Sequence, residues 1–424
     1  MYCDILVIGA GILGLSSAYH LKSQNPNKRI LVIDKLSGPG QGNTAKSAGG
    51  FRNLFTSKTN YLLANSTINW FDHLQNDLNY DLKFAYTGYL YLYSKFQYSH
   101  LRKSFDKMKS KGIEFRTFEK DELRHLIPDL VTNFEGDKEA ELMGLEPVEI
   151  GVLGVKCGTI NTDAIARCYE AEFLKIGGEV KYNIIANRLI TRPEKEFGIP
   201  GEPFIWQDVV VAGTNTNYGE INAKRTVVAA GVWSERLLDP IGFDSMIRPK
   251  TRVIFVFKDQ KLERLLHLKG MNNYGFLPHT HLTNTKLYLI GDLTEKSIWL
   301  GCAEDFGRKY GLEDDPKPNE HLYSKNAYHA LVKYLPCFKD VRPINMWAGQ
   351  RAINRFDSIP IVTSAPGMIY VGAATGNGIL KCDALGRIVA ALYSDENETI
   401  LYSGYNFKVS DLGIANRNVE KEKF

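Results

Sequence analysis

Asp4-Ile5-Leu6-Val7-Ile8-Gly9-Ala10-Gly11-Ile12-Leu13-Gly14, close to the start of the chain, joins a short apolar run to the pattern G-x-G-x-x-G. Such a run, ending in glycine, is typical of a strand buried on both faces of a parallel sheet. Gly9 permits a tight turn, Gly11 lets a diphosphate approach the backbone, and Gly14 lets the following helix pack on the strand. The helix N-terminus adds free N–H groups and partial positive charge. The stretch therefore predicts a strand, a turn and a helix that hold the diphosphate of a dinucleotide.

The residues after this turn complete one βαβ unit of about 30 residues. Residues 12–22 have a helical pattern, and Arg29-Ile30-Leu31-Val32-Ile33-Asp34 predicts the second strand. Asp34 lies 20 residues beyond Gly14 at the end of that strand, where a carboxylate accepts hydrogen bonds from ribose hydroxyls. An acid at this offset supports dinucleotide binding more strongly than a glycine pattern alone.

The overall composition of the 424 residues excludes several classes of protein. The net charge is only +4 and the basic residues are scattered, so we expect no nucleic-acid partner. The six cysteines are far apart and form no Cys-x-x-Cys pair, which argues against a disulfide scaffold and against a metal site. The sequence shows no signal peptide and no apolar run of the roughly 20 residues that span a bilayer. We expect a cytoplasmic protein, with a peripheral membrane contact left open.

Patterns of strand, glycine loop and helix return in the last third of the chain. Met368-Ile369-Tyr370-Val371-Gly372 predicts a strand, Gly376-Asn377-Gly378 a loop, and residues 383–393 a helix. The region between the two ends is richer in aromatic residues and in antiparallel strand patterns. We therefore expect a discontinuous nucleotide-binding domain with a substrate domain inserted into it. The nucleotide-binding domain would comprise residues 1–90, 155–240 and 345–424, and the substrate domain residues 91–154 and 241–344.

Four further stretches resemble the D-amino-acid-oxidase superfamily of flavoproteins, within it the sarcosine oxidase, glycine oxidase and dye-linked proline dehydrogenase relatives. They are Gly42-Asn43-Thr44-Ala45-Lys46-Ser47-Ala48-Gly49-Gly50-Phe51-Arg52, residues 226–234, residues 347–351 with 357–361, and residues 372–379 followed by Gly386-Arg387. The likeness covers most of the chain and is weakest between residues 95 and 155. It implies an α/β fold with a Rossmann-type, glutathione-reductase-like FAD-binding domain and an inserted, mainly antiparallel α+β substrate domain.

The resemblance implies FAD as the cofactor and indicates the residues that hold it. The loop after Gly372 is expected to offer backbone N–H groups to the pyrimidine end of the flavin. The expected cofactor-binding residues are Gly9, Gly11, Ile12, Leu13, Gly14, Asp34, Lys35, Thr44, Ser47, Gly49, Gly50, Ala230, Gly231, Gly376, Asn377, Gly378 and Ile379. Asn377 stands where the family usually has histidine. Since no cysteine lies around Gln350 for covalent attachment, we expect non-covalent FAD.

The resemblance also indicates two arginines as the expected catalytic residues. Arg351 fits the position that grips a substrate carboxylate, for which a planar guanidinium fork is well suited. Arg52 fits a basic residue close to the flavin, where it would stabilise the reduced form. The alternatives are an interdomain salt bridge for Arg351 and a purely structural role for Arg52.

The sequence leaves the roles of three other residues open. Lys381 sits one position after the family's lysine, a shift that turns a helical side chain by about 100°. Tyr274 and His279 lie in an aromatic strand region that would either line a pocket or simply pack. His279-Thr280-His281 has a spacing that suits a metal on a strand, but the sequence supplies no third ligand.

The function that these features favour is FAD-dependent oxidation of the C–N bond of a small amino acid or secondary amine. Hydride leaves Cα for flavin N5, so no side-chain base is required. One alternative is a dehydrogenase of a 2-hydroxy acid or glycerol phosphate, which predicts a titrating histidine in the pocket. A second is a flavin-stabilised subunit of a larger complex without its own turnover. The sequence leaves open the substrate, the electron acceptor and the formation of oligomers.

Overall fold

The computed structural model describes residues 1–292, 294–303, 309–415, 417 and 422. Its first sheet has eight strands and forms the centre of the nucleotide-binding part. Six strands follow the order β17-β18-β11-β1-β2-β8, and β10 and β9 continue from β11. These strands are β1 (Tyr2–Ile8), β2 (Ile30–Ile33), β8 (Glu179–Lys181), β9 (Ala186–Pro193), β10 (Val209–Thr216), β11 (Gly219–Val228), β17 (Ile361–Ala365) and β18 (Met368–Gly372).

Strand β1 lies between β11 and β2 and pairs in parallel with both. This placement explains its sequence, because Ile5, Leu6 and Val7 are fully buried and an apolar side chain is needed on both faces. The strand β18 from the last third of the chain pairs in parallel with β11, so the two ends of the chain share one sheet. The predicted Rossmann-type α/β fold is confirmed.

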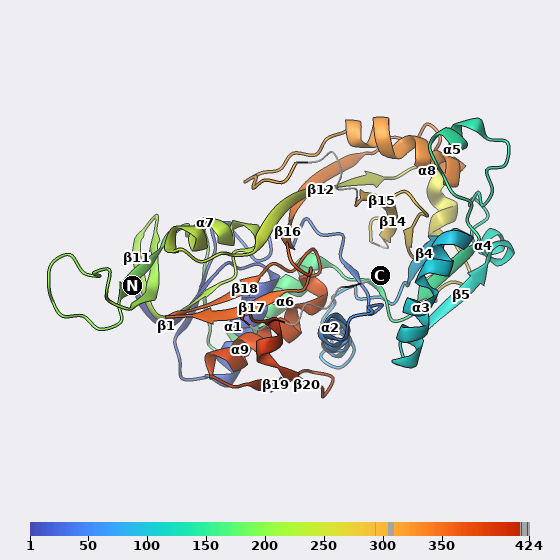
Figure 1. Ribbon diagram of the computed structural model, residues 1–424. Helices are drawn as coiled ribbons and strands as arrows, with labels where there is room; N and C mark the ends of the chain where they lie inside the picture. The colour runs from blue at the N-terminus through green and yellow to red at the C-terminus, as the bar shows by residue number, and fades with distance from the viewer. Residues whose placement is uncertain (293, 304–308, 416, 418–421, 423–424) are drawn as a thin grey trace.

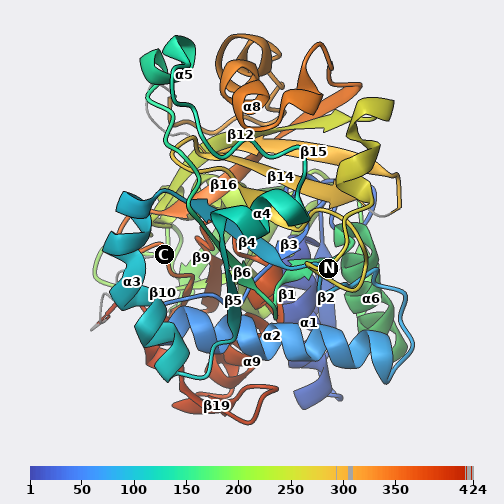
Figure 2. The same ribbon diagram turned by 90° about the vertical axis from the view of Figure 1, so that its right-hand side faces the viewer.

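Four helices cover the first sheet (Figures 1 and 2). They are α1 (Ile12–Gln24), α2 (Lys58–Asn76), α6 (Thr162–Lys175) and α9 (Cys382–Tyr393). Helix α1 packs against both α6 and α9, and α2 packs against α9. Helix α2 begins at Lys58, where the side chain of Ser57 caps it by accepting a hydrogen bond from the backbone N–H of Asn60.

The second sheet also has eight strands, in the order β16-β12-β15-β14-β13-β4-β6-β5. All of its pairs are antiparallel except β13 with β4. Its strands are β4 (Tyr89–Tyr93), β5 (Phe115–Glu119), β6 (Ile150–Gly154), β12 (Ile247–Phe257), β13 (His279–His281), β14 (Leu287–Asp292), β15 (Ser297–Cys302) and β16 (Asn345–Asn354). This sheet is the expected mainly antiparallel α+β part.

The remaining helices are α3 (Lys95–Ser110), α4 (Lys120–Leu126), α5 (Lys138–Leu142), α7 (Ser234–Leu238) and α8 (Tyr328–Tyr334), and the strand pairs are β3 (Gly50–Phe51) with β7 (Gly158–Thr159) and β19 (Glu398–Ile400) with β20 (Asn406–Lys408). Of these helices, α3, α4, α5 and α8 lie around the second sheet, and α7 lies beside the first (Figure 1). Among the described residues, none of the helices combines the length and the apolar character needed to cross a membrane.

The sheet to which residues 345–354 belong differs from the one that the expected domain boundaries imply. Residues 345–354 form β16, which pairs with β12 in the second sheet although the sequence assigned this range to the nucleotide-binding domain. In Figure 1 the long strands β12 and β16 run from one part of the molecule to the other. We propose that the two sheets mark the two domains and that the chain passes between them along these strands.

Candidate active site

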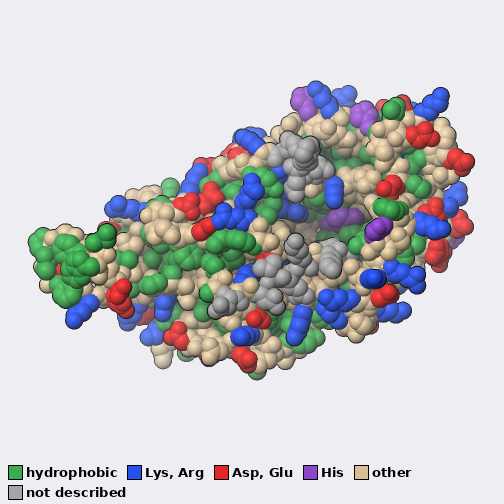
Figure 3. Space-filling view, in the orientation of Figure 1, with side chains coloured by type: hydrophobic (Ala, Val, Ile, Leu, Met, Phe, Trp, Pro, Cys, Tyr) green, Lys and Arg blue, Asp and Glu red, His purple; other side chains and the backbone are tan. Residues whose placement is uncertain are grey.

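A cavity of about 670 Å³ lies between the two sheets and is lined by residues of both. Figure 3 shows the molecule hollowed between its two parts, with histidine and Lys or Arg side chains along the hollow. Most of the residues predicted from the sequence line this cavity. They are Gly9, Gly11, Ile12, Leu13, Asp34, Lys35, Thr44, Ser47, Gly50, Arg52, Ala230, Gly231, His279, Arg351, Gly376, Asn377, Gly378 and Ile379.

The turn between β1 and α1 forms one end of the cavity. Gly9 has a φ of +112°, and a Cβ there would lie 2.5 Å from the carbonyl oxygen of Ala229. A Cβ built on Gly14 would collide with the carbonyl oxygen of Gly9, so Gly14 serves the packing of the helix on the turn. A Cβ on Gly11 meets only Thr44 Oγ1, at 3.6 Å. Gly11 therefore keeps an open approach from the cavity to the backbone at the start of α1.

Asp34 organises this turn as well as lining the cavity. Its Oδ2 accepts a hydrogen bond from the backbone N–H of Ala10 at 2.6 Å, and its Oδ1 accepts from Leu36 at 2.8 Å. Burial raises the pKa of the carboxyl group, and these two hydrogen bonds oppose the shift. Each carboxylate oxygen has a second lone pair, which leaves Asp34 able to accept from a ribose hydroxyl.

A small cluster of side chains frames the same end of the cavity. Lys35 Nζ lies 4.0 Å from the centre of the Trp233 ring, and the indole N–H of Trp233 donates to Asp314 at 3.0 Å. Arg236 donates to both oxygens of Asp314, at 2.8 and 3.0 Å. Asp314 thus connects the segment that begins at residue 309 to Trp233 and Arg236, which line the nucleotide end of the cavity.

The opposite end of the cavity is basic and aromatic. Three arginines line it: Arg52, Arg252 and Arg351. The aromatic and imidazole side chains that line it are Tyr89, Tyr91, His279, His281 and Tyr288. Tyr89 stacks on His279 with ring centres 3.8 Å apart, and Tyr91 stacks on His281 at 4.7 Å. Burial, together with the charges of Arg52 and Arg351, lowers the pKa of His281 to about 3.

The two predicted catalytic arginines are held in different ways. Arg52 donates to the carbonyl oxygen of Leu54 at 2.7 Å, and its guanidinium lies 4.3 Å from the centre of the Phe55 ring. Arg351 projects from β16 against the last glycine loop, since a Cβ on Gly376 would lie 2.7 Å from Arg351 Nε. Gly376 has a φ of +75°, so both its backbone and the adjacent guanidinium require a residue without a side chain.

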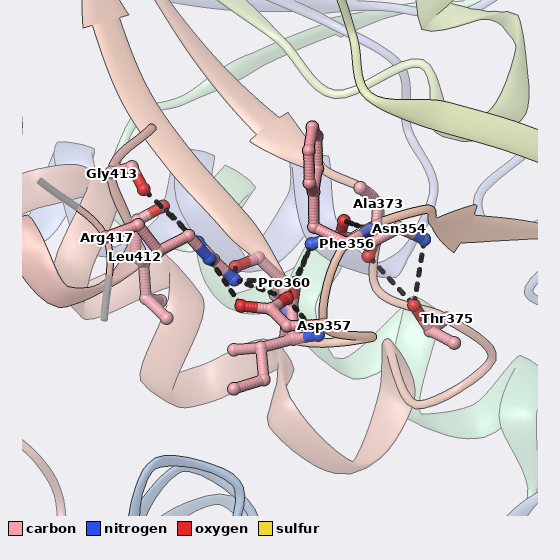
Figure 4. A network of polar contacts seen from close by, with 10 residues as sticks. Asn354, Phe356, Asp357, Pro360, Ala373, Thr375, Leu412, Gly413 and Arg417 are labelled. Carbon is pink, nitrogen blue, oxygen red and sulfur yellow. Dashed lines mark hydrogen bonds and ion pairs between the residues drawn. The ribbon is translucent and has the colours of Figure 1, made fainter. Parts of the chain in front are cut away.

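The glycine loop itself is fastened to β16 by hydrogen bonds (Figure 4). Asn354 N–H donates to Thr375 Oγ1 at 3.0 Å, and Thr375 N–H donates to the carbonyl oxygen of Ala352 at 2.9 Å. Ala373 and Thr375 both have a φ of +51°, a conformation that costs energy in residues with side chains. The loop then enters a 3₁₀ turn at Ile379–Lys381, which leads into α9.

The remaining predicted residues lie away from the cavity wall. Gly14 and Gly49 do not line it, and Tyr274 is 45% exposed. Lys381 is fully buried and donates to Asn60 Oδ1 at 2.6 Å. Burial and the charge of Arg52 lower the pKa of Lys381 to about 7.

Sequence reasoning missed Tyr89, Tyr91, Tyr288 and Arg252, and it considered His281 only as a metal ligand. The signal was present as alternation: Tyr89-Leu90-Tyr91-Leu92-Tyr93 and His279-Thr280-His281 place every second side chain on one face of a strand. Registers of β13 with β4 and β14 then bring these faces together, with His279 opposite Tyr89 and His281 opposite both Tyr91 and Tyr288.

The residues present fit a bound FAD. The open backbone at Gly11 faces the cavity at a helix N-terminus, as a diphosphate requires. From there the cavity continues past the loop of residues 42–52 to the glycine loop at 374–380. A dinucleotide fold whose cavity reaches such a loop and a basic, aromatic end is typical of a flavoprotein oxidoreductase.

The chain belongs to the family of FAD dependent oxidoreductases designated DAO, whose model matches residues 4–392. It is 22% identical to the sarcosine oxidase subunit beta of Rhodobacter capsulatus over 398 residues, which cover 92% of this chain and 86% of the relative. Identity to the L-2-hydroxyglutarate dehydrogenase of Escherichia coli is 25% over 246 residues, covering 57% of this chain and 50% of the relative. The solved glycine oxidase of Geobacillus kaustophilus has the same fold, with a TM-score of 0.74 at 16% identity over 98% of this chain and 99% of that one. The resemblance, the fold class and the FAD dependence predicted from the sequence are confirmed, and the chain is an FAD-dependent enzyme.

Proposed function

We propose that this enzyme oxidises the C–N bond of a small amino acid or secondary amine. The observation that carries the proposal is the position of Arg351, whose guanidinium lies in the cavity against Gly376 of the flavin-side glycine loop. A carboxylate bound there would hold its Cα close to that loop. The likeness to a sarcosine oxidase subunit supports an amine as the group that is oxidised.

In this reaction a bound FAD would supply the hydride acceptor. The cavity residues would bind the substrate and favour its reactive protonation state. Arg351 would bind the substrate carboxylate through two N–H donors and orient Cα. The positive charges of Arg52 and Arg351 disfavour an ammonium ion and so favour the neutral amine, whose lone pair is needed for the oxidation.

A second candidate is the oxidation of a 2-hydroxy acid, and one observation favours it. His279 and His281 line the cavity, whereas the amine reaction needs no side-chain base. A hydroxy acid needs a group that takes the hydroxyl proton. The partial likeness to an L-2-hydroxyglutarate dehydrogenase points in the same direction. Burial lowers the pKa of both imidazole rings, which makes them weak bases and counts against this candidate.

Anaerobic reduction of the flavin distinguishes the two candidates. The purified enzyme would be mixed without oxygen with amino acids, N-methyl amino acids, carboxylate-free amines and 2-hydroxy acids, and the flavin absorbance recorded. We expect bleaching by amino acids or their N-methyl derivatives. Bleaching by hydroxy acids alone would replace the proposed function with the second candidate.

Two further properties belong to this proposal. We expect acid precipitation to release intact FAD, because no cysteine lies around Gln350; flavin that stays with the precipitate would show a covalent bond. We also propose an amino acid or amine as the small-molecule partner. Turnover needs an electron acceptor in addition, and sedimentation of the active enzyme would reveal an oligomer or an obligatory second subunit.

A further inference from the structure

His279 has two ring nitrogens that are buried, and neither has a hydrogen-bond partner among the described residues. The ring lines the active-site cavity, and the residue as a whole is only 5% exposed. Buried polar groups in native proteins nearly always have a partner, so an unpaired imidazole in a cavity indicates a missing ligand.

The ring is packed among other aromatic side chains. It is stacked on Tyr89 at 3.8 Å, on His281 at 5.0 Å and on Tyr288 at 5.1 Å. Gly50 leaves the space that the ring occupies, since a Cβ there would lie 2.9 Å from His279 Nδ1. The imidazole is therefore held in one orientation before any ligand arrives.

The ionisation state of His279 fits the role of a hydrogen-bond acceptor. Burial, with the charges of His281 and Arg52, holds the pKa of the imidazole well below its usual value, so the ring is neutral. A neutral imidazole offers one donor and one acceptor nitrogen. Arg52, Arg252 and Arg351 have only donors, which suit a carboxylate but cannot accept from an N–H group.

We propose that His279 binds the substrate directly, its unprotonated ring nitrogen accepting a hydrogen bond from the N–H of the amine that is oxidised. This inference rests on the proposed function and extends it. When a guanidinium binds the substrate carboxylate and His279 accepts a hydrogen bond from the substrate N–H, the two contacts fix the rotation about the Cα–N bond of the substrate. The substrate class narrows to primary and secondary amines, because a neutral tertiary amine has no hydrogen to donate.

A pair of substrates and a pair of variants test the proposal. The substrates are the most reactive amino acid of the anaerobic panel and the same acid with every amine hydrogen replaced by methyl. His279→Phe keeps a ring of similar size in the stack but removes both nitrogens, and His279→Gln keeps an acceptor. We expect His279→Phe to lower kcat/KM about 10- to 100-fold for the N–H substrate, and His279→Gln to recover part of that loss.

The methylated acid supplies the control within the same cavity. For it, His279→Phe should change kcat/KM, or the inhibition constant if the acid does not react, by less than about threefold. Equal losses with both substrates would overturn the inference while leaving the proposed function in place. Failure of every amine to reduce wild-type flavin would remove the proposed function and the inference together.

Thermal unfolding gives a readout that does not depend on turnover. The addition of the N–H substrate under anaerobic conditions should stabilise wild-type enzyme more than His279→Phe. Equal stabilisation of the two proteins would overturn the proposal.

Discussion

Arg351 is the residue on which the proposed function depends most. Replacing it with lysine keeps the charge but removes the planar fork, so one contact with the substrate carboxylate is lost. We expect Arg351→Lys to cost about 1.5–3 kcal/mol in kcat/KM for an amino acid, roughly a 10- to 100-fold loss, with normal FAD content. A carboxylate-free amine should lose much less. Equal losses for the two substrates, measured by steady-state kinetics, would assign Arg351 to structure.

Gly11 and Gly14 belong to one motif but have different tasks. A side chain at Gly11 meets no protein atom closer than 3.6 Å, whereas one at Gly14 collides with the backbone of Gly9. Gly11→Val should therefore fold normally and lose FAD, because the branched side chain fills the approach of the diphosphate. Gly14→Val should disturb the fold itself. Flavin content and circular dichroism measure both effects, and stoichiometric FAD in folded Gly11→Val would contradict the assignment.

His281 makes the stability of the enzyme depend on pH. It stays neutral down to about pH 3 in the folded protein, whereas in the unfolded chain it takes up a proton below about pH 6.5. Between these values the unfolded state binds one more proton. Each unit by which the pH is lowered therefore reduces the free energy of unfolding by up to about 1.4 kcal/mol. Urea unfolding at about pH 7.5, 6 and 5 should show a flatter dependence for His281→Phe than for wild type.

The exposed His100 on α3 gives the control for this comparison. His100→Phe makes the same replacement at an exposed position, and we expect it to leave the slope of stability against pH at its wild-type value. If His281→Phe and wild type had the same slope, the neutral, buried state of His281 would be wrong.

At this scale, the sequence identified residues whose role is local and missed those that depend on strand register. Gly9, Gly11 and Asp34 could be found because a turn and its flanking strands are contiguous in sequence. Tyr288 could not, because it reaches His279 only through the pairing of β13 with β14. The pocket histidines were open alternatives because the sequence does not show which face of β13 turns inward.

At the scale of elements, the contact between α1 and α9 joins the two ends of the chain. A Cβ on Gly386 would lie 2.7 Å from both the carbonyl oxygen of Ser16 and His20 Cδ2, so the helices approach closely only because this residue is glycine. Gly386→Leu should destabilise the enzyme by about 1–3 kcal/mol through overpacking, which exceeds the helix propensity gained, about 1 kcal/mol.

Thermal and urea unfolding measure this effect, and Gly311→Ala is a suitable control. Gly311 has open space around it among the described residues, so an added methyl should leave stability within about 0.5 kcal/mol of wild type. A stable Gly386→Leu variant would mean that α1 and α9 separate without cost, contrary to the packing described here.

The elements themselves followed from periodicity to different degrees. The βαβ unit of β1, α1 and β2 was predicted well, because its apolar runs and glycines act locally. Residues 95–126 are harder to assign from sequence, since they hold α3, the strand β5 and the helix α4, and charged side chains cover all three. Residues 322–334 form a π-helical segment, Leu322–Ala327, followed by α8.

For the whole molecule, the active site exists only because two sheets built from distant parts of the chain meet at one cavity. The sequence predicted that its two ends form one domain, and in the structure β18 pairs with β11 in the sheet that also contains β1. It did not indicate that β16, which carries Arg351, pairs with β12. Partners in a sheet are set by packing over long separations, and no local pattern in residues 345–354 reveals them.

A buried ion pair between Asp357 and Arg417 links the loop after β16 to the last described part of the chain. Asp357, in the loop after β16, accepts hydrogen bonds from Arg417 at 2.7 Å, from Asn354 at 2.9 Å and from the N–H of Ile359 at 2.9 Å (Figure 4). Arg417 also donates to four carbonyl oxygens, including those of Ile359 and Pro360. The aspartate of the family-like segment therefore has a structural task, and its partner lies 60 residues further along the chain.

Removal of one member of this pair should damage both stability and cofactor binding. Asp357→Asn leaves the guanidinium of Arg417 buried without its counter-charge, which typically costs about 3–5 kcal/mol. Because Asn354 also holds Thr375 of the glycine loop, the same variant should bind FAD more weakly. The double variant Asp357→Asn/Arg417→Met should lose less stability than the sum of the losses in the two single variants. We expect a difference of at least about 1 kcal/mol. Urea unfolding of the four proteins, with FAD affinity measured by fluorescence, completes the cycle; additive losses would show that the pair does not act as a unit.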